Sequence, residues 1–108
     1  MTKIKIDNAV DIKIREIQQY IVTNFSAHRA ALKVRKEILI PIRSLQKFPD
    51  SGNFISNVYG DIKTKYQNYR RLIAGHYIIL YLYDDTSDIC FVDFIFDSRT
   101  DYLSELQA

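Results

Sequence analysis

The hydrophobic pattern of this 108-residue sequence changes its period once, and this change limits the folds that the chain can adopt. Up to about residue 48 the apolar residues recur every three or four positions, the spacing of one face of a helix. From residue 69 onward they form runs rich in aromatic and β-branched residues, which is typical of strands. Helices followed by strands predict the α+β class, with helices packed on one face of an antiparallel sheet.

Two amphipathic helices are predicted in the first half of the chain. The first carries one apolar stripe, with Asp7 or Asn8 as its N-cap: Val10, Ile14, Ile17, Ile21 and Phe25. The second runs to about Lys47, with Ser26 as its N-cap, and carries a similar stripe: Ala31, Val34, Ile38, Ile42, Leu45 and Phe48. Because proline removes a backbone donor, we expect Pro41 to kink this helix or end it near Ile40.

Strands are predicted mainly in the second half. A short first strand covers Lys3–Ile6, and three more cover 69–74, 77–83 and 89–96. Gly75-His76 and the acidic run 84–88 form the hairpin turns, residues 53–66 form a loop, and residues 99–106 form a short helix at most. The predicted order is β-α-α-β-β-β, an antiparallel meander packed on a two-helix hairpin within a single domain spanning residues 1–108.

The composition excludes several classes of protein. With 47% apolar residues, a chain of this length buries one core without a metal or disulfide. Cys90 is the single cysteine and lies in an extended aromatic run, so we expect a buried thiol in a reducing compartment. No run reaches the roughly 18 apolar residues of a membrane span, and no apolar stretch follows the first lysines as in a signal peptide. We therefore predict a cytoplasmic protein without membrane contact.

Charge is distributed unevenly along the chain. Residues 27–47 carry a local charge of +5 and residues 61–81 carry +3, whereas residues 82–108 carry −6. A basic surface favours polyanions such as nucleic acid, because each neutralised phosphate releases condensed counterions. The alternative is that many of these bases occupy the solvent face of one helix.

Few residue patterns point to chemistry. The sequence has no glycine-rich phosphate loop, no Cys/His metal spacing and no serine nucleophile elbow, so we predict neither a metal nor a cofactor. His76 is a candidate general acid or base, or a turn histidine that faces water. Arginine and tyrosine, which grip phosphate, stack on bases and exchange protons, supply the other candidates: Tyr69, Arg70, Arg71, Arg99 and Tyr102. In the alternative interpretation these residues are structural. Arg70 and Arg99 connect the sheet to the helices through carboxylates such as Asp97 or Asp101, and Tyr102 caps the core.

Four segments in order resemble the RelE/ParE superfamily of bacterial type II toxin–antitoxin toxins. They lie in the first helix (17–21), at the end of the second (42–49), along the strand hairpin (69–81) and after the last strand (98–102). The resemblance covers nearly the whole chain. It implies that the protein is a small toxin from a toxin–antitoxin system of the plasmid-stabilisation type. A cognate antitoxin would neutralise this toxin.

The resemblance implies two alternative targets. RelE-like members cut mRNA on the ribosome without a metal, whereas ParE-like members inhibit DNA gyrase and are not nucleases. On the RelE-like pattern, Arg71 contacts RNA phosphate, Arg99 stabilises the transition state and Tyr102 acts on the proton or stacks on the base, with Tyr69, Arg70 and His76 as substrate-binding candidates. The sequence departs from that pattern at Ile78, where an arginine is common, and at Tyr69, where lysine is frequent.

The sequence hypothesis is therefore a ribosome-dependent mRNA endoribonuclease that inhibits translation. A ParE-like gyrase inhibitor is the first alternative. A catalytically degenerate module that only binds an antitoxin-like peptide, for example at an exposed sheet edge, is the second.

Overall fold

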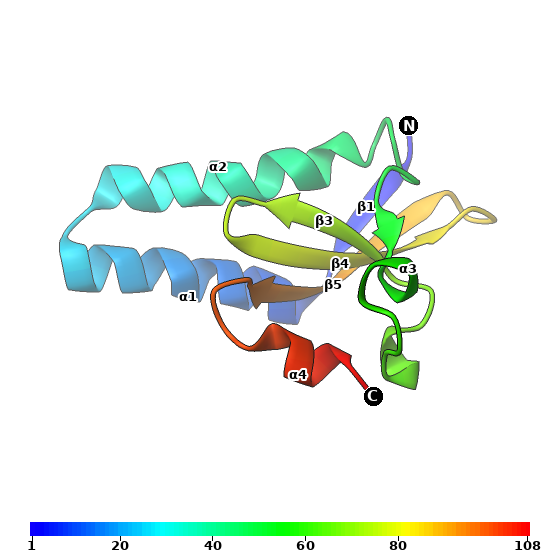
Figure 1. Cartoon of the computed structure of the whole chain (residues 1–108). Coiled ribbons are helices and arrows are strands. Elements are labelled where there is room, and N and C mark those ends of the chain that lie inside the picture. Colours follow the sequence, from blue (N-terminus) through cyan, green and yellow to red (C-terminus); the bar gives the residue numbers. More distant parts are fainter.

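The computed structural model describes all 108 residues and has the α+β architecture that the sequence predicts (Figure 1). Two long helices lie side by side and pack on one sheet, and short segments cover the opposite face of the sheet. The elements in chain order are β1 (Lys3–Ile6), α1 (Asn8–Phe25), α2 (His28–Ser44), β2 (Asn53–Phe54), α3 (Ile55–Tyr59), the 3-10 turn η1 (Thr64–Tyr66), β3 (Arg70–Ala74), β4 (Tyr77–Asp84), β5 (Ile89–Asp97) and α4 (Tyr102–Leu106).

The sheet is mixed rather than wholly antiparallel. Its five strands lie in the order β1-β5-β4-β3-β2, and β3, β4 and β5 form the predicted antiparallel meander. β1 lies at one edge, parallel to β5, because the helical hairpin carries the chain back across the sheet before the meander begins. A β-bulge in β5 leaves Asp93 without a partner, since Leu80 pairs with Phe94 and Tyr81 pairs with Val92.

The helix ends differ in part from the prediction. Asp7 is the N-cap of α1, as expected, and its carboxylate accepts a hydrogen bond of 2.8 Å from the Ala9 amide. The prediction for Ser26 was wrong. Ser26 adopts a left-handed conformation with φ 49° and ends α1, because the chain must reverse within two residues. Ala27 precedes α2 and provides no side-chain cap.

Pro41 does not end α2, so of the two predicted effects, a kink or an early end near Ile40, the early end was wrong. The helix continues to Ser44. Ile38, Ile42 and Leu45 lie on both sides of the proline and are at most 1% exposed. Their burial against the sheet holds the last turn in place despite the missing backbone donor.

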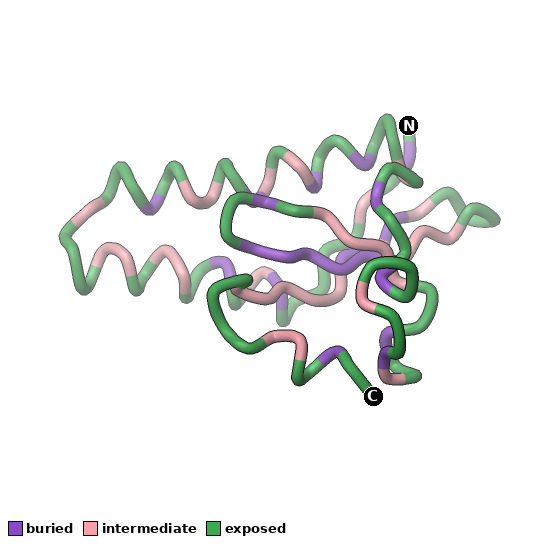
Figure 2. The backbone as a smooth tube through the Cα atoms, in the orientation of Figure 1, coloured by how far each residue is buried: buried purple, intermediate pink, exposed green.

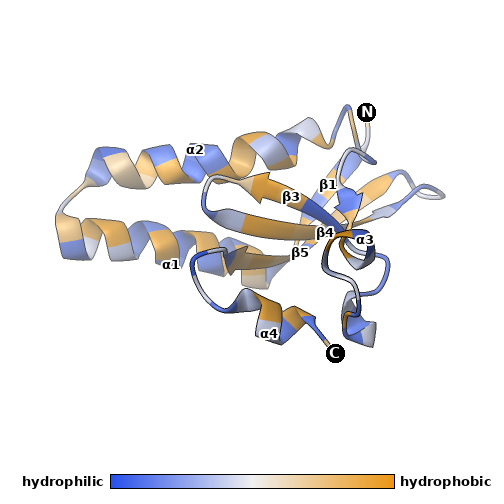
Figure 3. Ribbon diagram, in the orientation of Figure 1, coloured by the Kyte–Doolittle hydropathy of each residue, from blue (hydrophilic) through white to orange (hydrophobic).

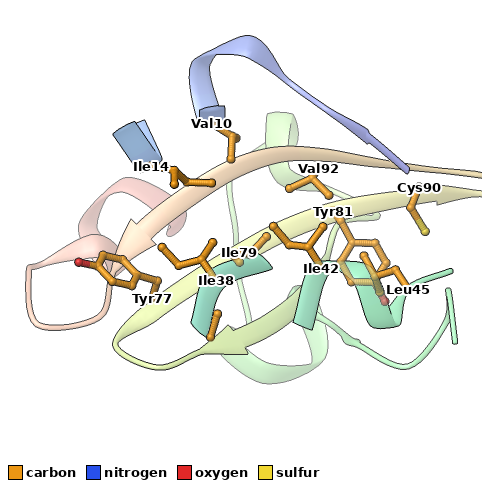
Figure 4. Packing of buried hydrophobic residues seen from close by; sticks show 11 residues of the cluster. Val10, Ile14, Ile38, Ile42, Leu45, Tyr77, Ile79, Tyr81, Cys90 and Val92 are labelled. Atoms are coloured by element: carbon orange, nitrogen blue, oxygen red, sulfur yellow. The ribbon is translucent and has the colours of Figure 1, made fainter. Parts of the chain in front are cut away.

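The core has two parts, one on each face of the sheet. Between the helices and the sheet, residues such as Val10, Ile38 and Ile79 form the larger cluster (Figure 4). On the opposite face, residues such as Ile55, Leu80 and Leu106 form a smaller one. The central strand β4 alternates between the two clusters and is buried throughout Tyr77–Tyr81 (Figure 2), in keeping with its hydrophobic sequence (Figure 3). Cys90 is fully buried, as predicted, and its burial raises the pKa of the thiol to about 11.

The long helices extend beyond the sheet. The α1–α2 turn projects past the β3–β4 hairpin (Figure 1). As a result, the predicted apolar stripe of α1 is buried at Val10 and Ile14 but emerges toward its end, where Phe25 is 66% exposed. Phe48, predicted to extend the stripe of α2, is also exposed.

Residues 53–66 were predicted to be a loop, but they contain β2, α3 and η1. Ile55, Ile62 and Tyr66 anchor this segment in the smaller cluster and are at most 4% exposed. The sequence does not reveal these elements, because the three buried residues are spaced unevenly. Each short element buries too few side chains to show the period of a helix or a strand.

Candidate functional site

The six candidate residues from the sequence lie in four places. Arg71 and Tyr102 lie together on the face of the sheet opposite the long helices. Arg99 and His76 line a groove on the side of the long helices. Tyr69 and Arg70 make separate contacts elsewhere. Arg71 and Tyr102 both contact Tyr59, whereas the side chain of Arg99 contacts Asp97 and lines the groove.

Arg71, Tyr59 and Tyr102 form what we call the tyrosine–arginine cluster. Nη1 of Arg71 donates a hydrogen bond of 3.2 Å to the Tyr59 hydroxyl, and the guanidinium carbon lies 5.4 Å from the centre of the Tyr59 ring. The hydroxyls of Tyr59 and Tyr102 are 3.3 Å apart. This hydrogen bond, followed by burial, raises the pKa of Tyr102, so the phenol stays protonated at neutral pH.

The register of β3 determines which of the two adjacent arginines joins this cluster. Arg71 pairs with Leu80 of the smaller core cluster, whereas Arg70 pairs with Tyr81 of the larger one. Adjacent strand residues point to opposite faces, so only Arg71 reaches Tyr59. Sequence reasoning missed Tyr59 because it lies in the aperiodic segment. In the sequence, the only feature that marks Tyr59 is its position directly before Gly60.

Arg70 and Tyr69 are both held in structural contacts. Nη1 of Arg70 donates to the Asp50 and Gly52 carbonyls at 3.1 and 2.8 Å, and its guanidinium carbon lies 3.9 Å from the centre of the Phe54 ring. The Tyr69 hydroxyl donates to the carboxylate of the bulged Asp93 at 2.6 Å. Burial and this carboxylate raise the pKa of Tyr69 far above its usual value. The Tyr69 hydroxyl therefore already has a carboxylate acceptor, and Arg70 uses Nη1 for backbone contacts.

Arg99 is held by a carboxylate two residues earlier. Its Nε and Nη2 atoms donate to the two oxygens of Asp97 at 3.0 and 2.9 Å. Hydrogen bonding from Arg99 lowers the pKa of Asp97. His76 lies in the turn between β3 and β4, where its carbonyl accepts hydrogen bonds of 2.8 Å from the Ser98 amide and hydroxyl. Arg99 thus has the carboxylate partner that the alternative interpretation of the sequence named.

The Asp97–Arg99 pair predicts a small acid-dependent change in stability. A depressed carboxyl pKa stabilises the fold above the ordinary value of 3.8, and this contribution disappears as the pH falls through the depressed value. We expect Arg99→Gln to lower the free energy of unfolding slightly at neutral pH. Below the depressed pKa of Asp97 the substitution should leave the free energy of unfolding unchanged. Urea denaturation of both proteins at each pH checks this, and an equal difference at all pH values would contradict it.

The groove beside Arg99 is the largest concave surface of the protein. We call it the helix groove. It has a volume of about 690 Å³ and lies among α1, α2 and the strand ends at His76, Tyr77 and Arg99. Its walls carry six hydrophobic residues: Ile17, Tyr20, Ile21, Phe25, Val34 and Tyr77. The charged rim includes Lys13, Glu16 and Glu37.

Two aromatic rings of the helix groove are open to solvent. Tyr20 is 61% exposed and Phe25 is 66% exposed, and their ring centres lie 6.1 Å apart in an edge-to-face arrangement. Exposed apolar surface of this kind, with a polar rim, marks protein-binding sites. The groove therefore combines exposed aromatic rings with a charged rim.

Two further observations bear on the class of protein. No group of three His, Cys, Asp or Glu side chains is arranged to hold a metal ion. None of the helices combines the length and apolar character needed to cross a bilayer.

The fold defines the class as a small α+β protein in which a helical hairpin packs on one face of a mixed five-stranded sheet. A family model described as ParE toxin of type II toxin-antitoxin system, parDE, matches residues 4–102. Because this match spans nearly all of the chain, the protein belongs to that family of type II toxins. An antitoxin protein is accordingly one of its partners. No curated protein sequence matches the chain.

Proposed function

We propose that this toxin acts by binding DNA gyrase and that the helix groove is the surface that docks on a protein partner. The observation that supports this most strongly is the separation of the catalytic candidates. Arg71 and Arg99 lie on different sides of the sheet, and Arg99 is already paired with Asp97. The helix groove, by contrast, offers apolar walls and exposed aromatic rings, which suit a protein target.

The matching family model is described as a ParE toxin. On the resemblance of the sequence to the RelE/ParE superfamily, ParE-like members are the ones that inhibit gyrase, and we carry that target over to this chain as part of the proposal. We further propose that the antitoxin neutralises the toxin by covering the helix groove, so that antitoxin and target compete for one surface. Action on gyrase places the free toxin in the cytoplasm.

The test is a supercoiling assay with gyrase and the purified full-length chain, freed of antitoxin. We expect inhibition of supercoiling together with accumulation of cleaved DNA–gyrase complexes. Primer extension on a reporter mRNA in cells that express the toxin serves as the parallel measurement. Unchanged supercoiling together with new mRNA cleavages at codon boundaries would reject the gyrase proposal.

The tyrosine–arginine cluster supports the second candidate, a ribosome-dependent mRNA endoribonuclease. In the cleavage step the 2′-hydroxyl of the RNA would attack the adjacent phosphorus and lose its proton to water, while the bond from phosphorus to the 5′-oxygen breaks and a 2′,3′-cyclic phosphate forms. Arg71 would stabilise charge on the phosphorane, and the protonated phenol of Tyr102 would supply a proton to the leaving 5′-oxygen. If new mRNA cleavages appear, Arg71→Gln and Tyr102→Phe should abolish them, whereas Arg15→Gln, at an exposed arginine on α1, should not.

A further inference from the structure

The outward face of α2 carries a row of five exposed residues, four of them positively charged and one, Ile40, apolar. Its members follow one another at spacings of four and three residues, so they lie along one side of the helix: Arg29, Lys33, Lys36, Ile40 and Arg43. All five are exposed. The buried residues of α2 (Ala31, Ile38 and Ile42) occupy the opposite side and pack in the core. We call this outward face the cationic stripe.

The charges of the cationic stripe are not neutralised within the protein. No carboxylate forms an ion pair with any of its four cations, although α1 has such a pair between Arg15 and Asp11. Glu37 is the single acid within residues 27–47, and it lines the helix groove instead. The stripe therefore presents an uncompensated field to solvent.

This arrangement works against the stability of the helix. Like charges three or four residues apart repel one another along the stripe. Arg29 lies in the first turn of α2, where the helix dipole disfavours a cation, and that turn has no acid and no side-chain cap. A face that served only solubility would mix both signs of charge, as α1 does. The stripe is better explained by a polyanionic ligand.

We propose that the cationic stripe binds the phosphate backbone of double-stranded DNA without reading its sequence. From Arg29 to Arg43 the stripe spans about 21 Å of a straight helix, comparable to roughly six phosphates along one strand of a duplex. It holds no aromatic residue. Proteins that bind single strands stack bases on aromatic rings, so the stripe suits a regular backbone rather than unpaired bases.

The DNA-binding surface is distinct from the surfaces discussed above. None of the stripe residues lines the helix groove or contacts the tyrosine–arginine cluster. Figure 3 shows polar segments recurring along α2, whose apolar side faces the sheet. This inference goes beyond the proposed function and does not depend on it, because backbone binding to DNA is measured without gyrase.

The experiment measures fluorescence anisotropy of a labelled DNA duplex of arbitrary sequence, about 20 base pairs or two turns long, as the full-length chain is added. The variant Lys33→Gln/Lys36→Gln/Arg43→Gln removes three charges from the stripe and keeps residues of good helix propensity. The control Lys3→Gln/Lys5→Gln/Arg15→Gln removes two lysines and one arginine from exposed positions elsewhere. Both variants therefore change the formal net charge from +2 to −1.

We expect the stripe variant to bind the duplex at least about tenfold more weakly than the control does. The slope of log affinity against log salt should fall in magnitude by about 2.7 for three lost phosphate contacts. Circular dichroism checks that both variants remain folded. The single variants Lys33→Gln and Lys36→Gln, each expected to change the slope by about 0.9, repeat the test with smaller perturbations.

Three outcomes would overturn the proposal. Equal loss of affinity in the two triple variants would show that net charge alone governs binding. Equal or tighter binding to polyglutamate or to single-stranded DNA would assign the stripe to an acidic protein or to unpaired nucleic acid. Tighter binding to an RNA duplex of the same length would exclude DNA as its ligand.

Discussion

Replacing Gly52 with alanine is expected to lower the free energy of unfolding by about 3 kcal/mol, one of the largest losses for a change of a single methyl group in this chain. An added Cβ at this buried position would lie 2.5 Å from the backbone carbonyl oxygen of Arg71 and 2.9 Å from the Tyr81 ring and hydroxyl. The carbonyl belongs to β3 and cannot rotate away, so the two backbones must separate.

The separation would also break a buried contact. The Gly52 amide donates a hydrogen bond of 2.9 Å to the Tyr81 hydroxyl, and the Gly52 carbonyl accepts one from Arg70. A melting temperature lower by roughly 10–15 °C, measured by circular dichroism, would agree with this loss. The double variant Gly52→Ala/Tyr81→Phe tests the cause. It removes the clashing hydroxyl and leaves the carbonyl, so it should not restore stability, and full rescue would contradict the backbone explanation.

The requirement for glycine at position 52 could not be predicted from the sequence. The sequence Phe48-Pro-Asp-Ser-Gly52 predicts a turn after α2. It does not reveal that the turn lies against β3, because that contact joins residues far apart in the chain. Only the paired positions of β2 and β3 bring the two backbones together.

Long periodic segments, in contrast, were predictable from the sequence. The two long helices and the three runs of the meander agree with the structure, because each places buried side chains at a regular spacing, although the stripe of α1 is buried only at Val10 and Ile14. The parallel pairing of β1 and the bulge at Asp93 were not predicted, since neither leaves a local pattern. The short elements within residues 53–66 were not predicted either, because they also leave no local pattern.

The candidate site shows the same division. Residue type and family resemblance pointed to Arg71 and Tyr102, and the structure brings this pair together through Tyr59. The sequence could not separate Arg70 from Arg71, because a slip of one residue in a strand exchanges its faces. It also assigned Phe25 to the core side of α1. The Phe25 ring is exposed because α1 extends beyond the edge of the sheet. How far the sheet covers α1 depends on the tertiary arrangement and leaves no pattern in the sequence.

This exposure at the end of α1 leads to the largest functional effect that we expect. Tyr20→Ala/Phe25→Ala should weaken binding of the toxin to its protein target by about 100-fold or more, and growth arrest on expression should disappear. Aromatic residues in a pocket often contribute about 2 kcal/mol or more each to an interface. The fold should be nearly unaffected, because both rings are more than half exposed and alanine favours the helix.

Phe48→Ala is the matched control for this double variant. Phe48 is 61% exposed, as Tyr20 is, but it follows α2 and does not line the helix groove. Colony counts after induction, with thermal unfolding of each protein, give the comparison. If Tyr20→Ala/Phe25→Ala remains folded and fully toxic, the target binds elsewhere, and the tyrosine–arginine cluster becomes the surface to test. If toxicity disappears together with capture by the antitoxin, both partners use the helix groove, and competition for it explains neutralisation.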